Sequence, residues 1–295
     1  MRAALSTLEV VRPSGLDRAL AALHDSLASE RLTPLAGGTD LFVYLNAGTH
    51  SGTRFLDVSA LRELRGIRVT KASVKIGGGV TFREIREHAD LNKRLPSLVA
   101  AAAEVGAWQI QNRATLAGNV ANASPAGDSL PVLLAHDAIV HARSVRGARG
   151  IPFAELYRGY RDLALEADEL IVGLEIPWPA PRAFSFFRKV GTRRAQSISK
   201  VVLSGVLEQD TRGVVTHARL AWGSVAPVTL RSRTAEAALI GQKPSAAVTE
   251  SARRALLDDI APIDDIRSER EYRVAVAGNV LEQMLRAADA RFAKD

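Results

Sequence analysis

Apolar residues recur at two periods along this chain, which predicts a mixture of helices and strands. Leucines fall at near-helical spacing within residues 16–27, and Ser14 and Asp17 are typical of a helix start. Residues 81–84, Thr-Phe-Arg-Glu, form a capping-box pattern that opens a helix reaching about Asp90. Further helices are predicted at residues 98–105, 131–135, 234–240, 246–257 and 272–288.

Alternating apolar and polar residues predict short strands in every part of the chain. They are expected at residues 33–36, 54–58, 74–77, 138–142, 170–176, 197–207 and 217–224. Segment 170–176 has a period of two, and the Asp-Thr-Arg-Gly sequence at 210–213 is typical of a turn. Prolines within residues 177–181 suit neither a helix interior nor a central strand, so a domain boundary is expected near residue 180.

The composition narrows the class of protein. With 295 residues, 47% of them hydrophobic, the chain is long enough for two or three compact units with sizeable cores. The net charge of +7 comes from 39 basic and 32 acidic residues that are scattered, which disfavours a nucleic-acid-binding stripe. Residues 1–10 lack a signal-peptide pattern, and no apolar run approaches the ~20 residues of a membrane span. We expect a cytoplasmic location, while export together with a partner that carries a signal stays open.

Two residue types restrict the chemistry further. The chain has no cysteine, so it forms no disulfide and holds no iron–sulfur cluster through thiolates. Its six histidines are dispersed, without an i,i+4 pair or neighbouring carboxylates at the spacing of metal ligands. We therefore expect no metal ion held by this chain.

Residues 113–128 are the clearest candidate for a binding segment. Small residues dominate this stretch and would let the backbone approach a flat or phosphorylated ligand closely. Thr115, Asn119 and Ser124 add fixed polar contacts, and Asp128 adds one carboxylate. The alternative is an ordinary irregular loop in which Asp128 caps the following helix.

A second glycine loop lies earlier, at residues 33–41. Gly37 and Gly38 follow a short extended segment and precede an apolar run, which is typical of a loop whose backbone amides wrap a pyrophosphate. The spacing is neither that of a dinucleotide G-x-G-x-x-G nor that of a P-loop. A plain Gly-Gly turn is the alternative.

Together the two loops resemble the FAD-binding medium subunit of the xanthine dehydrogenase and carbon monoxide dehydrogenase family, the molybdenum hydroxylases. The resemblance rests on Leu-Ala-Gly-Gly-Thr-Asp-Leu at 35–41, Thr-Leu-Ala-Gly-Asn at 115–119 and Ala-Ser-Pro-Ala-Gly-Asp at 123–128. Shorter matches stand at 109–113, 169–171, 187–189, 225–227 and 271–273, so it covers nearly the whole chain.

The resemblance implies an α+β fold. A two-lobed FAD-binding domain of the PCMH type, which is vanillyl-alcohol-oxidase-like, would span residues 1–179, with lobes of about 1–59 and 60–179. A C-terminal α+β domain of the CO dehydrogenase flavoprotein type, with an antiparallel sheet and helices, would span residues 184–295.

The resemblance also implies the cofactor, the partners and the function. This chain would carry FAD, take electrons from a [2Fe-2S] subunit and pass them to NAD, quinone or oxygen. A small iron–sulfur subunit and a large subunit with the molybdenum cofactor would be its partners, in a dimer of heterotrimers. No acid–base pair or nucleophile is then required of this chain. Xanthine, carbon monoxide, aldehydes and N-heterocycles all stay open as substrates of the complex.

By resemblance, the site residues can be assigned one by one. Ala36, Gly37, Gly38, Thr39 and Asp40 would line the pyrophosphate loop, with Leu35 and Leu41 packing beside it. Thr115, Gly118 and Asn119 would hold the phosphate and ribityl part, near Ser124, and Asp128 would reach the ribityl chain or the isoalloxazine edge. Ile171 would touch the flavin.

Lys189 matches a family lysine near the flavin. A cation there would stabilise negative charge on the reduced ring and raise its potential. Without the resemblance, a solvated lysine in a basic turn would be favoured.

Three positions depart from the family pattern. Gln111 stands where arginine is frequent and Ala117 where a second glycine is frequent, so phosphate contacts are expected to differ. Val105 replaces an aromatic residue of the xanthine dehydrogenases, which weakens the inference that NAD is the acceptor. Relatives with an extra iron–sulfur loop in this subunit need cysteines and are disfavoured.

Two other functions stay open at this point. A stand-alone FAD-dependent oxidoreductase of the same fold would need its own catalytic base, for which no candidate stands out. A nucleotide-binding or scaffold protein without redox function would not bind FAD.

Overall fold

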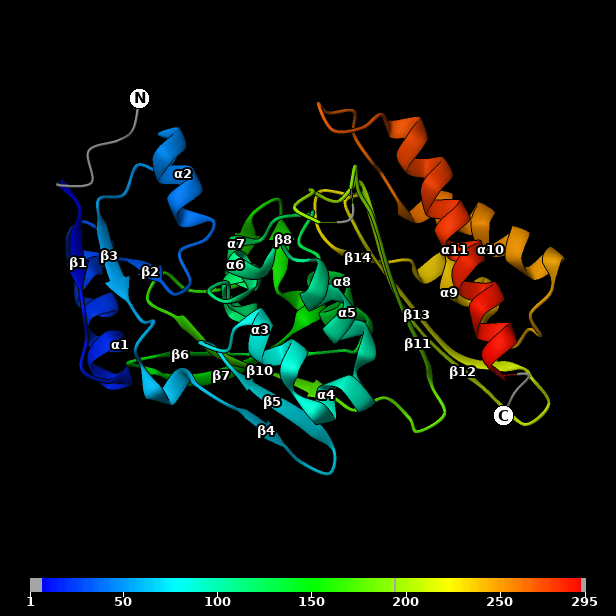
Figure 1. Ribbon diagram of the computed structural model, residues 1–295, viewed down its shortest axis with the longest axis horizontal. Helices are drawn as coiled ribbons and strands as arrows, with labels where there is room; N and C mark the ends of the chain where they lie inside the picture. The colour runs from blue at the N-terminus through cyan, green and yellow to red at the C-terminus, as the bar shows by residue number, and fades with distance from the viewer. Residues whose placement is uncertain (1–6, 194, 293–295) are drawn as a thin grey trace.

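The computed structural model describes residues 7–193 and 195–292. Within these ranges the chain forms sheets of three, five and four strands in succession, and a two-stranded hairpin (Figure 1). Helices accompany each of the larger sheets, so the expected mixture of α and β structure is confirmed. In the described part of the chain, no helix combines the length and apolar character needed to cross a membrane. The expected domain ends at residues 1–6 and 293–295 lie outside the described residues.

The first sheet is small and parallel, and its strands follow the order β1-β3-β2. Its elements are β1 (Glu9–Val11), α1 (Leu16–Asp25), β2 (Thr33–Leu35), α2 (Leu41–Ala47) and β3 (Arg54–Asp57). The predicted leucine stripe is buried at Leu16, Leu20 and Leu23, but the helix ends at Asp25, and Leu27 is exposed in a 3₁₀ turn. No side chain caps α1 at its N-cap Gly15; instead the carboxylate of Glu63 accepts the Leu16 N–H at 2.9 Å.

The second sheet has five antiparallel strands in the order β4-β5-β10-β6-β7. The strands are β4 (Ile67–Val69), β5 (Ser73–Gly77), β6 (Ile139–Ser144), β7 (Gly147–Pro152) and β10 (Leu170–Pro177). The helices of this unit are α3 (Phe82–Glu87), α4 (Ala89–Arg94), α5 (Pro96–Glu104), α6 (Trp108–Gln111), α7 (Leu116–Asn122) and α8 (Leu130–Ala135). The two-stranded hairpin, β8 (Tyr157–Gly159) and β9 (Asp162–Leu163), precedes β10.

The structure of this unit differs from two predictions. The capping box is present in full, because Thr81 and Glu84 each bond the other's backbone N–H, but the helix ends at Glu87 and His88 is extended. The strand predicted at 170–176 is present as β10, but the predicted alternation of buried and exposed side chains is wrong. This strand is central in the sheet and bulged after Ile171, and most of its side chains are buried.

The third sheet is antiparallel in the order β11-β12-β13-β14. Its strands are β11 (Phe184–Val190), β12 (Val201–Gln209), β13 (Val215–Gly223) and β14 (Leu230–Arg231), and the helices after them are α9 (Arg233–Leu239), α10 (Ala246–Asp259) and α11 (Arg270–Phe292). Helices α5 and α8 of the second unit contact β11, β12 and β13 on one face of this sheet. Helices α9 and α11 pack on the other face (Figure 1). The third sheet is therefore shared between two hydrophobic cores, one on each face.

A buried carboxylate joins the first unit to the second. Asp168 lies just before β10, and its side chain is 2% exposed. It accepts hydrogen bonds from both terminal nitrogens of Arg146, at the β6–β7 turn, and lies 2.9 Å from Nδ1 of His24 in α1. These bonds, above all those from Arg146, lower the pKa of Asp168 to about 2.

We predict that Asp168→Asn lowers the free energy of unfolding by about 1–2 kcal/mol at pH 7. The pKa of Asp168 is depressed in the folded chain, so its contribution is complete above the ordinary value of 3.8 and is lost as the pH falls through about 2. Urea unfolding at several pH values should show the difference between wild type and variant shrinking below about pH 4 and vanishing near pH 2.

The matched control is Asp17→Asn, which breaks an exposed pair with Arg143 between the same two units. Its expected cost is less than about 0.5 kcal/mol, because exposed ion pairs contribute little. Equal costs for the two variants, or a cost for Asp168→Asn that does not change with pH, would contradict this account of the contact.

Candidate functional site

The first glycine loop connects β2 to α2 and contains Ala36, Thr39 and Asp40 besides its two glycines. Gly38 has a φ of +74°, a conformation that side chains with a Cβ rarely adopt, and its carbonyl accepts the Phe42 N–H that begins α2. Within residues 7–193 and 195–292, the backbone N–H groups of residues 37–40 have no hydrogen-bond acceptor. The loop therefore presents adjacent donors that an anionic group can use.

The second glycine loop lies directly against the first. A Cβ atom on Gly37 would stand 2.1 Å from the carbonyl oxygen of Arg113, so only glycine permits this approach. The next residues are fixed by backbone hydrogen bonds from Phe82 to Ala114 and from Leu116 to Val80. The two glycine loops are thus neighbours in space, although Gly37 and Thr115 are 78 residues apart in the sequence.

Thr115 and Asn119 lie at the start and in the middle of α7. The buried Thr115 hydroxyl is the N-cap of this helix and accepts the N–H of Gly118 at 3.0 Å. The Asn119 carbonyl oxygen accepts the Ser129 hydroxyl at 2.7 Å, which leaves the Asn119 amide nitrogen as the donor end. Ser124 follows the helix and accepts the Ala126 N–H in a local turn.

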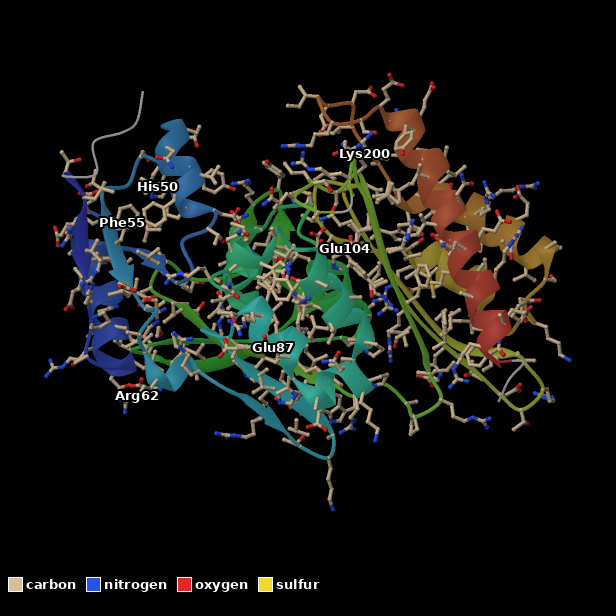
Figure 2. All side chains as sticks on the ribbon, in the orientation of Figure 1. His50, Phe55, Arg62, Glu87, Glu104 and Lys200 are labelled. Carbon is tan, nitrogen blue, oxygen red and sulfur yellow. The ribbon has the colours of Figure 1, made fainter. Side chains whose placement is uncertain are left out.

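Asp128 and Lys189 form a buried ion pair that connects the unit of the second sheet to the unit of the third sheet. Lys189 lies in β11, and its Nζ is 2.7 Å from the Asp128 carboxylate and 3.0 Å from the carbonyl oxygen of Glu104. Ser199 donates its hydroxyl to the other Asp128 oxygen at 2.5 Å. Figure 2 shows Glu104 where the central helices meet the long strands of the third sheet. The alternative of a solvated lysine in a basic turn is wrong, because the Lys189 side chain is 2% exposed.

The same contacts show that the Asp128 carboxylate is not a helix cap. The N-cap position of α8 belongs to Ser129, so the alternative in which Asp128 caps that helix is also wrong. Burial raises the pKa of Asp128, whereas the Lys189 ammonium and the Ser199 hydroxyl act in the opposite direction. A buried carboxylate of this kind is tolerated only because its charge is matched and its oxygens are hydrogen-bonded.

The apolar residues of the predicted site lie on two sides of the loops. Ile171 is buried in β10, and its carbonyl oxygen would be 2.5 Å from a Cβ on Gly78, so the strand and this glycine are in tight contact. Leu35 and Leu41 lie across the first glycine loop and line an apolar pocket of about 190 Å³. The other side chains that line it are Leu8, Val10, Phe42, Leu45 and Phe55.

Gln111 does not point into an open phosphate site. It is buried, its amide nitrogen donates to the carbonyl oxygens of Ala103 and Val105, and its oxygen accepts from Arg86. This glutamine therefore fixes the end of α5, close to the carbonyl of Glu104 that meets Lys189.

The structure adds residues that the sequence reasoning missed. Arg161, at the tip of the β8–β9 hairpin with a φ of +55°, donates to the hydroxyl of Tyr44, which in turn donates to Asn122. Surrounding protein raises the pKa of the nearby Asp40, while Arg161 opposes that shift. Ser199 was missed as well. Its partner Asp128 lies 71 residues away, so nothing in the local sequence around Ser199 indicates the contact.

We predict that Gly37→Ala lowers the free energy of unfolding by about 1–3 kcal/mol, since the new methyl group overlaps backbone that cannot easily move. Denaturant unfolding checks this. Gly159→Ala is the control, because its nearest neighbour would be 4.0 Å away. If the two variants are equally stable, the two glycine loops do not touch as described.

Residues 6–179 match the family model described as the FAD binding domain in molybdopterin dehydrogenase, and residues 186–288 match the CO dehydrogenase flavoprotein C-terminal domain. The xanthine dehydrogenase FAD-binding subunit of Escherichia coli O157:H7 is 31% identical over 87% of this chain and 88% of its own length. The nicotinate dehydrogenase FAD-subunit of Eubacterium barkeri is 32% identical over 80% of this chain and 81% of its own length.

Solved structures agree with these relatives. A chain of carbon monoxide dehydrogenase from Hydrogenophaga pseudoflava superposes with a TM-score of 0.91 at 28% identity, covering 96% of this chain and 98% of that one. A chain of reconstituted CO dehydrogenase from Oligotropha carboxidovorans gives a TM-score of 0.92 at 25% identity, covering 99% and 100%. With two glycine loops in contact and family matches over both parts, the chain belongs to the FAD-binding medium subunits of the molybdenum hydroxylase family.

Proposed function

We propose that the two glycine loops and the Asp128–Lys189 pair together hold FAD. The observation that carries this proposal is the set of backbone N–H groups at residues 37–40 without an acceptor in the described chain. They lie where Gly37 contacts the second glycine loop. Adjacent backbone donors in a glycine loop can bind a diphosphate without any charged side chain.

The residues that would line the diphosphate belong to both loops. Ala36, Gly37, Gly38, Thr39 and Asp40 contribute from the first loop, and Leu35 and Leu41 support it from the apolar side. Thr115, Gly118, Asn119 and Ser124 contribute from the second segment. The donor end of Asn119, fixed by Ser129, suits a phosphate or ribityl oxygen.

Asp128, Lys189 and Ile171 would form the flavin end of the site. When bound, FAD accepts electrons singly and releases them in pairs, which suits a subunit between one-electron and two-electron carriers. The Lys189 ammonium, held by Asp128 and the Glu104 carbonyl, provides a fixed positive charge that favours negative charge on a reduced ring. Ile171, in the central strand, provides an apolar contact that excludes water.

The partners and the domain limits extend this proposal. We infer a small iron–sulfur subunit and a large molybdenum subunit, because a chain without cysteine cannot hold the clusters itself. A dimer of heterotrimers and passage of electrons to NAD, quinone or oxygen are part of the same inference. We also propose domains at 1–179, with PCMH-type lobes of about 1–59 and 60–179, and at 184–295; the separate family matches over residues 6–179 and 186–288 support the division between the two domains. A cytoplasmic location stays a prediction.

We predict that the full chain binds FAD with a stoichiometry close to one, and that Asp128→Ala and Gly38→Val each weaken binding about tenfold or more. Asp128→Ala leaves the buried Lys189 unpaired, and Gly38→Val forces a branched side chain into a left-handed conformation beside Phe42. Titration followed by flavin fluorescence gives the Kd, and circular dichroism shows whether each variant is folded.

Two control variants separate local effects from general instability. Gly66→Val meets the same left-handed strain at φ +91° but faces open space, and Asp289→Ala removes an exposed carboxylate of α11. Both should bind FAD like the wild type. A folded wild type that binds no FAD, or site variants that bind as the controls do, would refute the proposed site.

A further inference from the structure

Arg273 in α11 is a buried cation far along the chain from both glycine loops. Its side chain is 5% exposed, and its Nη2 lies 2.8 Å from the carboxylate of Asp265. Burial alone would raise the pKa of Asp265, but the backbone N–H groups of Arg267 and Ser268 and the guanidinium of Arg273 hold it below its ordinary value. Arg273 is therefore anchored to an ionised carboxylate in the segment between α10 and α11.

The other arm of the guanidinium reaches the third sheet. Nη1 of Arg273 donates to the carbonyl oxygens of Lys200 and Ser224, both at 2.9 Å. These residues lie just before β12 and just after β13, so one nitrogen holds the ends of two neighbouring strands together. Lys200, labelled in Figure 2, lies at the end of these strands, and its ammonium lies over the ring of Tyr272.

Ser224 continues the contact toward the proposed flavin site. It has a φ of +65°, which is strained for serine, and its hydroxyl donates to the carbonyl oxygen of Ser199 at 3.0 Å. Its backbone N–H donates to the carbonyl oxygen of Pro125, in the segment between Ser124 and Asp128. The backbone carbonyl groups of Ser199 and Lys200 are therefore both fixed, the first by Ser224 and the second by Arg273.

We propose that Arg273 is a positioning residue that holds the Ser199 hydroxyl on Asp128 and so sets the electrostatics of the Asp128–Lys189 pair beside the flavin. This inference rests on the proposed function, because it needs that pair to lie at FAD. It assigns a role to the Glu-Tyr-Arg sequence at 271–273 and connects the C-terminal helix to the cofactor site through three serine and arginine contacts.

An arginine is needed here for geometric reasons. Its planar fork meets a carboxylate with one nitrogen and two carbonyl groups with the other, whereas a lysine ammonium is a single point of contact. Arg273→Lys should therefore retain the charge but lose part of the fixation. Arg273→Met should lose all of it, and should leave the half-buried Asp265 with Arg267 as its cationic partner.

The test uses the full chain loaded with FAD, with Arg273→Met, Arg273→Lys and Ser199→Ala compared with the wild type. The matched control is Arg286→Met, on the same helix, whose pair with Glu282 is exposed. FAD affinity, the visible flavin spectrum and the flavin reduction potential are measured, and none of these depends on turnover. Circular dichroism identifies the variants that are folded.

We expect Arg273→Met and Ser199→Ala to weaken FAD binding about tenfold and to shift the reduction potential in the same direction, with Arg273→Lys intermediate. The double variant Arg273→Met/Ser199→Ala should bind FAD no more weakly than whichever single variant binds it less tightly. Both changes disrupt the same contact, the Ser199 hydroxyl on Asp128. Arg286→Met should match the wild type. If Arg273→Met does not fold, the Arg273→Lys and Ser199→Ala results decide in the same way.

Different results overturn different claims. If the wild type and Arg286→Met bind no FAD, the proposed function fails and this inference fails with it. If they bind FAD and Asp128→Ala weakens binding, but folded Arg273 variants keep the wild-type potential, only the role of Arg273 is overturned. Additive effects in the double variant would also overturn it.

Discussion

The buried pair of Asp128 and Lys189 is the interaction on which the rest of this structure depends. It joins the segment after α7 to the first strand of the third sheet, and it includes the end of α5 through the Glu104 carbonyl. Two charges removed from water cost more than their attraction returns unless every contact is satisfied. The pair therefore constrains its surroundings, and Ser199, Ser224 and Gln111 all serve to satisfy or place its contacts.

The glycine loops impose a second constraint, on backbone rather than on charge. Gly37 must lack a Cβ for the first unit to meet the second, and Gly38 must adopt a left-handed conformation for α2 to begin where it does. The donors at residues 37–40 are a consequence of that geometry, because a loop pressed against other backbone cannot fold back to bond itself. Gly37 joins the first unit to the second, and Asp128–Lys189 joins the second to the third, so no unit forms the proposed site alone.

Much of this could be predicted from local sequence. The capping box at Thr81, the turn at 210–213 and the long C-terminal helices follow from short-range patterns, and the structure confirms them. The two glycine loops were also recognisable, because glycine pairs and small residues carry their own conformational meaning.

Long-range contacts could not be read in this way. Lys189 lies among basic residues after a proline-rich segment, and no strand was predicted over this stretch, which forms β11 in the structure. Its partner Asp128 is 61 residues away, and local sequence alone left a helix cap open as the alternative to a ligand contact for it. The bulge and double-sided burial of β10 likewise depend on neighbours that pattern analysis does not see.

The central claim is that both glycine loops and the buried ion pair contact one FAD molecule, and an experimental structure of the FAD-loaded chain tests it most directly. The account predicts diphosphate oxygens about 2.7–3.2 Å from backbone nitrogens of residues 37–40, and the isoalloxazine ring next to Asp128 and Lys189. A diphosphate bound elsewhere, or a flavin ring separated from the Asp128–Lys189 pair, would contradict it.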